Sequence, residues 1–177
     1  MSEHAERFID HLQALRARDH GALATLRHSL AFVPGAYPKA YPYVERFVGA
    51  ERPAGDARRL ALYAVAGLFA RHPRVQAQSF AAAFGALLRK RGSPSIEQRF
   101  VALLGADPDN IADYLRQAFS LLAAEDIGLD HARLLDDLSV WMNPRADRDR
   151  LLQQWARDFY RAAEEQTEPD STTTNAS

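Results

Sequence analysis

The side chains of this sequence that could do chemistry are mainly guanidiniums. Of its 22 lysines and arginines, only Lys39 and Lys90 are lysines. A guanidinium offers its N–H donors in a planar fork that fits phosphate oxygens and also stacks on nucleobases, so one interpretation is that arginines are needed for such contacts. A GC-rich coding bias, which the abundant alanine also indicates, would produce the same composition without any binding role. Both explanations stay open at the level of composition.

The charge is distributed unevenly along the chain. Residues 52–99 hold nine basic and two acidic residues, a net charge of +7, whereas residues 100–142 hold two basic and eight acidic residues, a net charge of −6. The whole chain carries a formal charge of −1. Arg58 and Arg59 open a predicted helix, where positive charges oppose the helix dipole. Their placement against the local electrostatics points to an anionic partner.

A basic run formed by Arg89, Lys90 and Arg91 falls in the last turn of another predicted helix. Cations at this end of a helix stabilise the helix dipole, which gives the run a structural explanation. Phosphate contact would explain the same three residues equally well.

Arg99 lies beside the apolar face of a helix that the sequence predicts over residues 95–104. Ser95 is expected to cap the N-terminus of this helix. The stem of Arg99 would then pack on the helix surface while its guanidinium reaches a partner. That partner is either a phosphate or, in an ion pair that locks two helices together, Asp107 or Asp137.

Motifs for catalysis and for metal binding are missing from the sequence. The chain has no cysteine, and its six histidines form no HExxH motif. Signatures of phosphate-binding loops, dinucleotide-binding turns and hydrolase nucleophiles are missing as well. Asp136 and Asp137 are neighbours that face different directions on a helix, so they do not make a paired acid/base device. We therefore expect no enzyme activity, no metal and no cofactor.

The apolar pattern predicts an all-α fold of about eight or nine helices. Apolar residues recur at helical spacing, and no segment alternates as a half-buried strand does. Turns at residues 49–55 and 93–95 are candidate boundaries of a two-lobed helical bundle, with an N-terminal lobe over residues 1–92 and a C-terminal lobe over residues 93–163. Residues 164–177 lack side chains to bury and are expected to form a disordered acidic tail.

The sequence gives no sign of a membrane or secreted protein. No apolar run is long enough to cross a bilayer, and the chain does not open on a secretory signal. The missing cysteines also fit a reducing compartment, so we expect a cytoplasmic location.

Aromatic and proline residues are interleaved over residues 34–47. Tyr37, Tyr41 and Tyr43 lie close to Lys39 and Arg46 in this segment. Their rings could stack on nucleobases, or they could close over one edge of the core.

Five segments, taken in order, resemble one known family. They are DHGALATLRHSL (19–30), AVAGLFARHP (64–73), SIEQRFVALLGAD (95–107), LRQAFSLLAAEDIGLDHARLLDDLSVW (115–141) and WARDFY (155–160). Together they look like the CasB-type small subunit of the type I-E CRISPR surveillance complex, Cascade. The resemblance covers nearly the whole predicted fold.

The resemblance implies an all-helical, non-enzymatic subunit of a guide-RNA-bearing complex in antiviral defence. Its implied partners are the large subunit and the backbone subunits of Cascade, the guide RNA, the target DNA and a second copy of itself. The implied role is to steady the target strand and the displaced strand of the R-loop through their backbones. Strand exchange is nearly balanced in free energy in another CRISPR effector, so modest phosphate contacts can shift it.

The resemblance also assigns candidate contacts. Arg27, Arg99 and Arg116 match arginines of the family motifs, and His28 stands where a second arginine would be expected. Arg145 and Arg148 fall where the family has basic residues after the tryptophan. Together with the basic residues discussed above, the candidate nucleic-acid contacts are Arg27, His28, Arg58, Arg59, Arg89, Lys90, Arg91, Arg99, Arg116, Arg145 and Arg148. The alternative is a helical protein–protein interaction module that makes no direct contact with nucleic acid.

Overall fold

The structure is a computed structural model, and it describes residues 2–165. These residues form nine α-helices: α1 (Glu3–Arg18), α2 (His20–His28), α3 (Tyr41–Val44), α4 (Ala57–Arg71), α5 (Phe80–Arg91), α6 (Pro94–Leu104), α7 (Ile111–Ala124), α8 (His131–Trp141) and α9 (Asp149–Glu164). Short 3₁₀ helices cover Ser29–Ala31, Pro38–Ala40 and Glu45–Phe47. Apart from one isolated bridge between Val75 and Leu129, residues 2–165 contain no β-structure.

The predicted all-α fold class is confirmed by this architecture. The acidic tail predicted over residues 164–177 lies outside the described residues from position 166 onward. Within residues 2–165, no helix combines the length and the apolar character that crossing a membrane requires.

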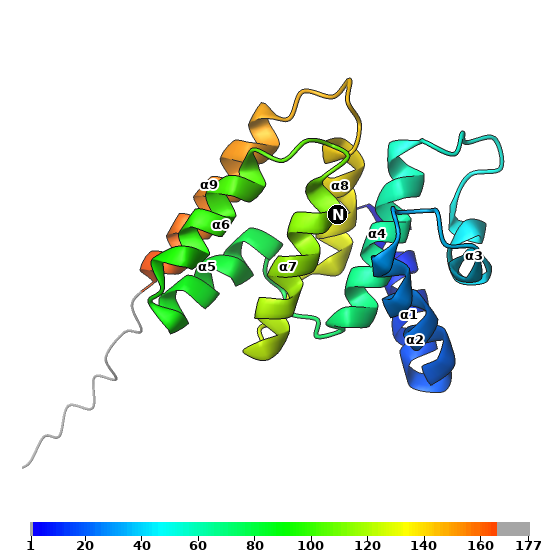
Figure 1. Ribbon diagram of the computed structural model, residues 1–177, viewed down its shortest axis with the longest axis horizontal. Helices are drawn as coiled ribbons and strands as arrows, with labels where there is room; N and C mark the ends of the chain where they lie inside the picture. Colours follow the sequence, from blue (N-terminus) through cyan, green and yellow to red (C-terminus); the bar gives the residue numbers. More distant parts are fainter. Residues whose placement is uncertain (1, 166–177) are drawn as a thin grey trace, which may run out of the picture.

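Helix α4 is the central element of the half of the molecule that contains α1 and α2 (Figure 1). It is buried continuously from Ala61 to Ala70, because its sequence is apolar on nearly every side. Asp56 caps its start by accepting the backbone N–H groups of Arg58 and Arg59 at 3.0 and 3.2 Å. Helices α2, α7 and α8 pack on α4. Helix α4 therefore fixes the relative positions of α2 and α7, and all three helices contribute to the candidate site.

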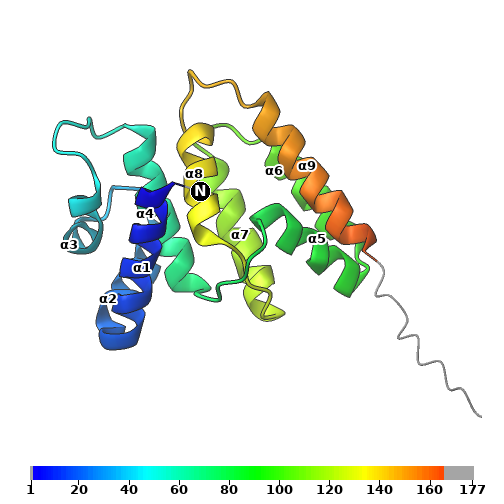
Figure 2. The same ribbon diagram turned by 180° about the vertical axis from the view of Figure 1, so that it is seen from behind.

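Helices α5 and α9 pack along each other at the opposite end of the molecule, with α6 beside them (Figures 1 and 2). Gly85 makes this close packing possible, because a side chain there would collide with the backbone carbonyl of Phe159. Phe100 of α6 stacks on Phe159, with ring centroids 3.9 Å apart. The aromatic contacts hold α6 in place, and with it Arg99.

Helix α8 joins the two ends of the molecule. It packs on α1 and α4, and it contacts α9 through Asp137, whose Oδ2 accepts the indole N–H of Trp155 at 2.8 Å. Burial raises the pKa of the Asp137 carboxyl to about 6. Helices from both sides of residue 92 therefore pack together, and the division into lobes at residues 92 and 93 stays a prediction.

Candidate nucleic-acid interface

Three arginines from three helices meet around one shallow pocket. Arg27 on α2, Arg71 on α4 and Arg116 on α7 line it, together with the polar side chains of Gln117 and Ser120. We call it the arginine pocket; its volume is about 350 Å³, and no carboxylate lies in its wall. All three arginines are exposed, so their guanidiniums are accessible to a ligand.

The packing of the helices brings these arginines together. Arg27 lies in the last turn of α2 and Arg71 in the last turn of α4, where a cation also stabilises the helix dipole. Arg116 follows the buried Leu115, so it emerges at the edge of the packed face of α7. Because α2 and α7 both pack on α4, the three side chains reach the same surface.

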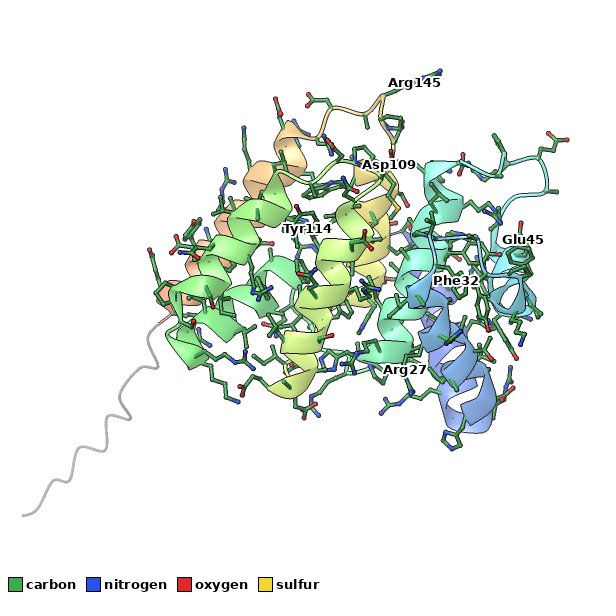
Figure 3. All side chains as sticks on the ribbon, in the orientation of Figure 1. Arg27, Phe32, Glu45, Asp109, Tyr114 and Arg145 are labelled. Carbon is green, nitrogen blue, oxygen red and sulfur yellow. The ribbon has the colours of Figure 1, made fainter. Side chains whose placement is uncertain are left out.

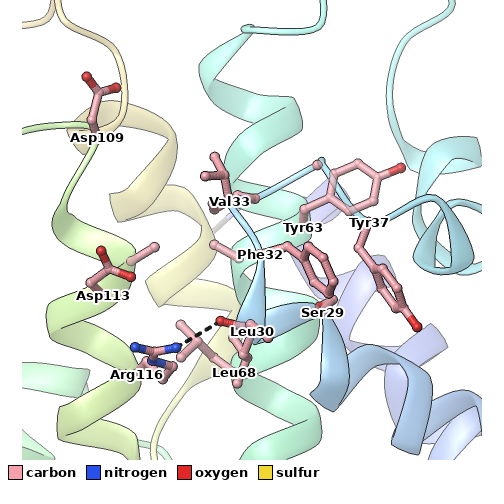
Figure 4. Close-up of a pocket in the computed structure, with 15 residues that line it drawn as sticks. Ser29, Leu30, Phe32, Val33, Tyr37, Tyr63, Leu68, Asp109, Asp113 and Arg116 are labelled. Carbon is pink, nitrogen blue, oxygen red and sulfur yellow. Dashed lines mark hydrogen bonds between the residues drawn. The ribbon is translucent and has the colours of Figure 1, made fainter.

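Each guanidinium is held by a neutral acceptor on a neighbouring element. Arg27 Nε donates to a carbonyl in the last turn of α4 at 3.3 Å, and Arg71 Nη2 donates to Ser120 Oγ at 3.4 Å. Arg116 Nη1 donates to the carbonyl of Leu30 at 3.2 Å (Figure 4). These contacts position the side chains and leave other N–H donors of each fork for a ligand.

The charges of the arginine pocket are not compensated within residues 2–165. None of its three arginines takes part in a salt bridge in this part of the chain. Like charges held near one another repel, and an anion placed among them relieves that repulsion. A phosphate suits this position, because guanidinium forks bind its oxygens bidentately.

Arg99 lies next to the arginine pocket. It is exposed on α6, and its Nη1 donates at 3.5 Å to Gln117, which lines the pocket. The alternative ion pair with Asp107 or Asp137 is not formed: the salt bridges among residues 2–165 do not include Arg99, and Asp137 bonds to Trp155 instead. The structure thus brings three of the sequence-predicted residues, Arg27, Arg99 and Arg116, to one surface.

Arg59 is directed into the molecule, unlike the other predicted contacts. Only 8% of the residue is exposed. Its guanidinium donates to the carbonyls of Gly35 and Ala54 at 3.5 and 3.1 Å and pairs with the Glu45 carboxylate at 3.5 Å. The positive charge at the start of α4 therefore has partners within the chain, and we remove Arg59 from the candidate contacts.

The basic run at the end of α5 also has intramolecular partners. Lys90 Nζ and Arg91 Nε both lie 3.0 Å from carboxylate oxygens of Glu125, and these contacts lower the pKa of the Glu125 carboxyl. Arg89 Nη1 donates at 2.6 Å to the carbonyl of Ala162 on α9. The run is exposed, but it does not line the arginine pocket.

Three other predicted contacts lie outside the arginine pocket. Arg58 is exposed and lines a separate cleft that includes the start of α1 and part of α8. Arg145 is exposed in the turn between α8 and α9, well separated from Arg27 in Figure 3. Arg148 lies in the same turn, where its Nη1 donates to a carbonyl at 3.2 Å and its guanidinium covers the ring of Trp141.

His28 is exposed at the end of α2, next to Arg27 in sequence. Its ring packs edge-on against Phe32 and Tyr37, with centroids 5.8 and 5.3 Å away. The structure therefore places His28 in an aromatic group and not in the wall of the arginine pocket.

Arg71 is absent from the contacts predicted from the sequence. It lies within the quoted segment AVAGLFARHP, where a cation in the last turn of an apolar helix has an adequate structural explanation. Only the crossing of α2 and α7 over α4 reveals that it meets Arg27 and Arg116.

Comparisons with known proteins agree on one family. A family model described as CRISPR-associated protein Cse2 matches residues 22–160. A CRISPR-associated protein Cse2 from Thermus thermophilus is 43% identical over 169 residues, which cover 92% of this chain and 94% of the relative. The crystal structure of M. ruber CasB matches with a TM-score of 0.75 at 32% identity, over 92% of this chain and 95% of that one.

A more distant structure shares the same fold. A chain of a CRISPR RNA-guided surveillance complex matches with a TM-score of 0.75 at 23% identity, over 92% of this chain and 94% of that one. The family resemblance seen in the sequence motifs is confirmed by the family model and by the relatives above 30% identity. This chain therefore belongs to the CRISPR-associated protein Cse2 family.

Proposed function

We propose that this protein is the non-catalytic small subunit of an RNA-guided CRISPR surveillance complex of the Cascade type, and that its arginine pocket binds phosphates of the single strands in the R-loop. Target strand and displaced strand are both steadied in this way. The observation that carries the proposal is the meeting of Arg27, Arg71 and Arg116 in a pocket without a carboxylate.

The proposed partners are the large subunit and the backbone subunits of Cascade, the guide RNA, the target DNA and a second copy of this chain, in the cytoplasm. The structural neighbour from an RNA-guided surveillance complex supports an assembly of this kind. The remaining candidates, of which only Arg148 is half-buried and the others are exposed, are proposed as contacts to other parts of that assembly: His28, Arg58, Arg89, Lys90, Arg91, Arg145 and Arg148.

Phosphate contacts are sufficient for such a role. Base pairing with the guide reads the target sequence, so a subunit that holds the strands needs no base-specific hydrogen bonds. Each phosphate that the protein neutralises on a single strand adds about 0.7 to the slope of log K against log salt. The arginine pocket therefore has a measurable signature in salt titrations.

The proposal is tested by replacing the three pocket arginines together with alanine. Single-stranded DNA binding is measured by fluorescence anisotropy over a range of salt concentrations, and the slope should fall by about 2 if each arginine neutralises one phosphate. A matched control replaces three exposed arginines of α9 and changes the net charge equally: Arg150, Arg157 and Arg161. Circular dichroism should show unchanged helicity in both variants.

The outcomes separate the two candidate functions. If the pocket variant and the control variant lose affinity equally, the net charge acts and the pocket does not. If the wild-type chain shows no log-linear salt dependence, it does not hold strands through their phosphates. The alternative, a helical interaction module whose arginines pair with carboxylates of partner proteins, would then be favoured.

A further inference from the structure

A second pocket adjoins the arginine pocket. It has a volume of about 270 Å³ and lies between segment 29–35 and helix α7. We call it the aromatic pocket, because Phe32 and Tyr37 contribute to its wall. Leu30 and Arg116 line both pockets, so the two share one wall, in which Arg116 donates to the carbonyl of Leu30 (Figure 4).

The wall of the aromatic pocket contains a pair of stacked rings, of which Phe32 is exposed and Tyr37 is half-buried. The rings of Phe32 and Tyr37 are 8° from parallel, with centroids 4.7 Å apart. Phe32 is 44% exposed and its neighbour Val33 is 73% exposed, whereas the eight other phenylalanines are buried or half-buried. A phenylalanine left in water forgoes the hydrophobic stabilisation that its burial would give. A ligand that covered the exposed Phe32 ring would therefore gain this stabilisation.

The loop that carries Phe32, residues 32–35, is held in place by hydrogen bonds to its Gly35 carbonyl. Gly35 has a φ of 82°, a conformation that favours glycine, and a side chain there would collide with the Arg59 guanidinium. Arg59 Nη2 and the Tyr41 hydroxyl both donate to the Gly35 carbonyl, at 3.5 and 3.0 Å. The buried Arg59 therefore anchors this loop, so the exposed ring is held in position before any ligand binds.

The charges of the two pockets differ. Asp109, in the turn before α7, and Asp113, in the first turn of α7, line the aromatic pocket opposite the segment of Leu30 and Phe32 (Figure 4). Carboxylates repel phosphate, but they accept hydrogen bonds from the exocyclic amino groups of nucleobases. The two adjoining pockets therefore offer a cationic side for a phosphate and an aromatic side, with hydrogen-bond acceptors, for a base.

We propose that the aromatic pocket binds one unpaired nucleobase, stacked on Phe32, of a single strand whose phosphate occupies the arginine pocket. Two pockets that share the wall residues Leu30 and Arg116 suit the adjacent phosphate and base of one strand. Stacking on an aromatic ring tolerates any base, because every base has a π-face. This site rests on the proposed function, since only a strand held at the arginine pocket delivers the base.

The test compares oligodeoxycytidine with an abasic oligonucleotide of the same length and phosphate number, binding to the full chain. Wild-type protein should bind oligodeoxycytidine about 5-fold or more tightly, because stacking of one base is worth about 1 kcal/mol or more. Phe32→Ala should lose this difference and keep the salt slope, while Phe32→Tyr should retain both. Val101→Ala is the control, because it removes an exposed apolar side chain on α6 that lines neither pocket.

Three results would overturn the base site alone. One is equal binding of the two oligonucleotides by wild-type protein that still shows the salt slope, and another is a Phe32→Ala variant that keeps the preference. The third is a Phe32→Ala variant that binds oligonucleotides normally but loses partner subunits from the assembled complex, which would identify a protein-docking surface. A wild-type chain without any salt slope would instead refute the proposed function, and the base site with it.

Discussion

Asp137→Asn should stabilise the protein at neutral pH and change its stability little in acid. The carboxylate lies between α8 and α9, where its Oδ2 accepts the indole N–H of Trp155 at 2.8 Å. Burial raises the pKa of Asp137 from 3.8 to about 6; the bond from Trp155 and the charge of Arg133 oppose this rise, whereas Asp136 and Asp158 add to it. The folded protein therefore binds the proton of this carboxyl more tightly than the unfolded chain does.

The sign and the size of the effect follow from that difference. Between pH 3.8 and about 6 the folded state holds more protons than the unfolded state, so the free energy of unfolding falls as the pH rises through this window. A rise of about 2 in pKa corresponds to about 3 kcal/mol, and the whole cost is present above pH 6. Asparagine keeps a carbonyl oxygen for Trp155 and has no charge to bury, so it removes this cost.

The assay is urea denaturation of both proteins at pH 4 and pH 7.5, followed by tryptophan fluorescence. The variant should be more stable by about 3 kcal/mol at pH 7.5 and by less than about 1 kcal/mol at pH 4. Asp10→Asn, which removes an exposed carboxylate from α1, serves as the control and should show no such pH-dependent gain. A variant that is less stable at pH 7.5, or a difference that does not vary with pH, would refute the reasoning. The bond from Trp155 to the charged oxygen would then outweigh the desolvation of Asp137.

Two further predictions concern the other helices. Gly85→Ala should destabilise the protein by about 1 to 3 kcal/mol in chemical denaturation, because the added methyl group collides with the Phe159 carbonyl. Gly105→Ala is the control and should have little effect, because the nearest atom to the added methyl group lies at 3.5 Å. Glu125→Gln should tighten the binding of single-stranded DNA at low salt, because it releases the two basic side chains that pair with this carboxylate. Unchanged affinity in anisotropy titrations would exclude the end of α5 from the interface.

The all-α class and part of the site could be predicted from the sequence because both leave local signals. Apolar residues at helical spacing indicate helices, and the family motifs single out Arg27, Arg99 and Arg116. The sequence mispredicted the start of α6, where two local signals for a helix start lie side by side. Ser95 was expected to cap α6, but the helix begins at Pro94, which is well suited to a first helical position, and the Ser95 hydroxyl bonds to that of Ser93 at 2.8 Å.

The direction of an arginine side chain was beyond prediction, because it depends on elements distant in sequence. Arg58 and Arg59 are neighbours at the start of one helix, yet Arg58 is exposed and Arg59 is buried. Arg59 is directed inward because Glu45 and the carbonyl of Gly35 bind its guanidinium. Both groups lie in the segment before α4, and the sequence does not reveal the path of that segment. Arg71 is the converse case: its position in the last turn of α4 explains it locally, and only tertiary packing places it beside Arg27 and Arg116.

The three arginines of the pocket lie on three different helices, and each is anchored to another element. A phosphate bound among them would cross-link α2, α4 and α7 without a covalent bond. Binding would then stabilise the junction of these helices, and by thermodynamic reciprocity a change in their packing would alter the affinity for the strand. The affinity of the site for a strand would therefore depend on how the three helices are arranged. A neighbouring subunit that moved α7 would raise or lower this affinity.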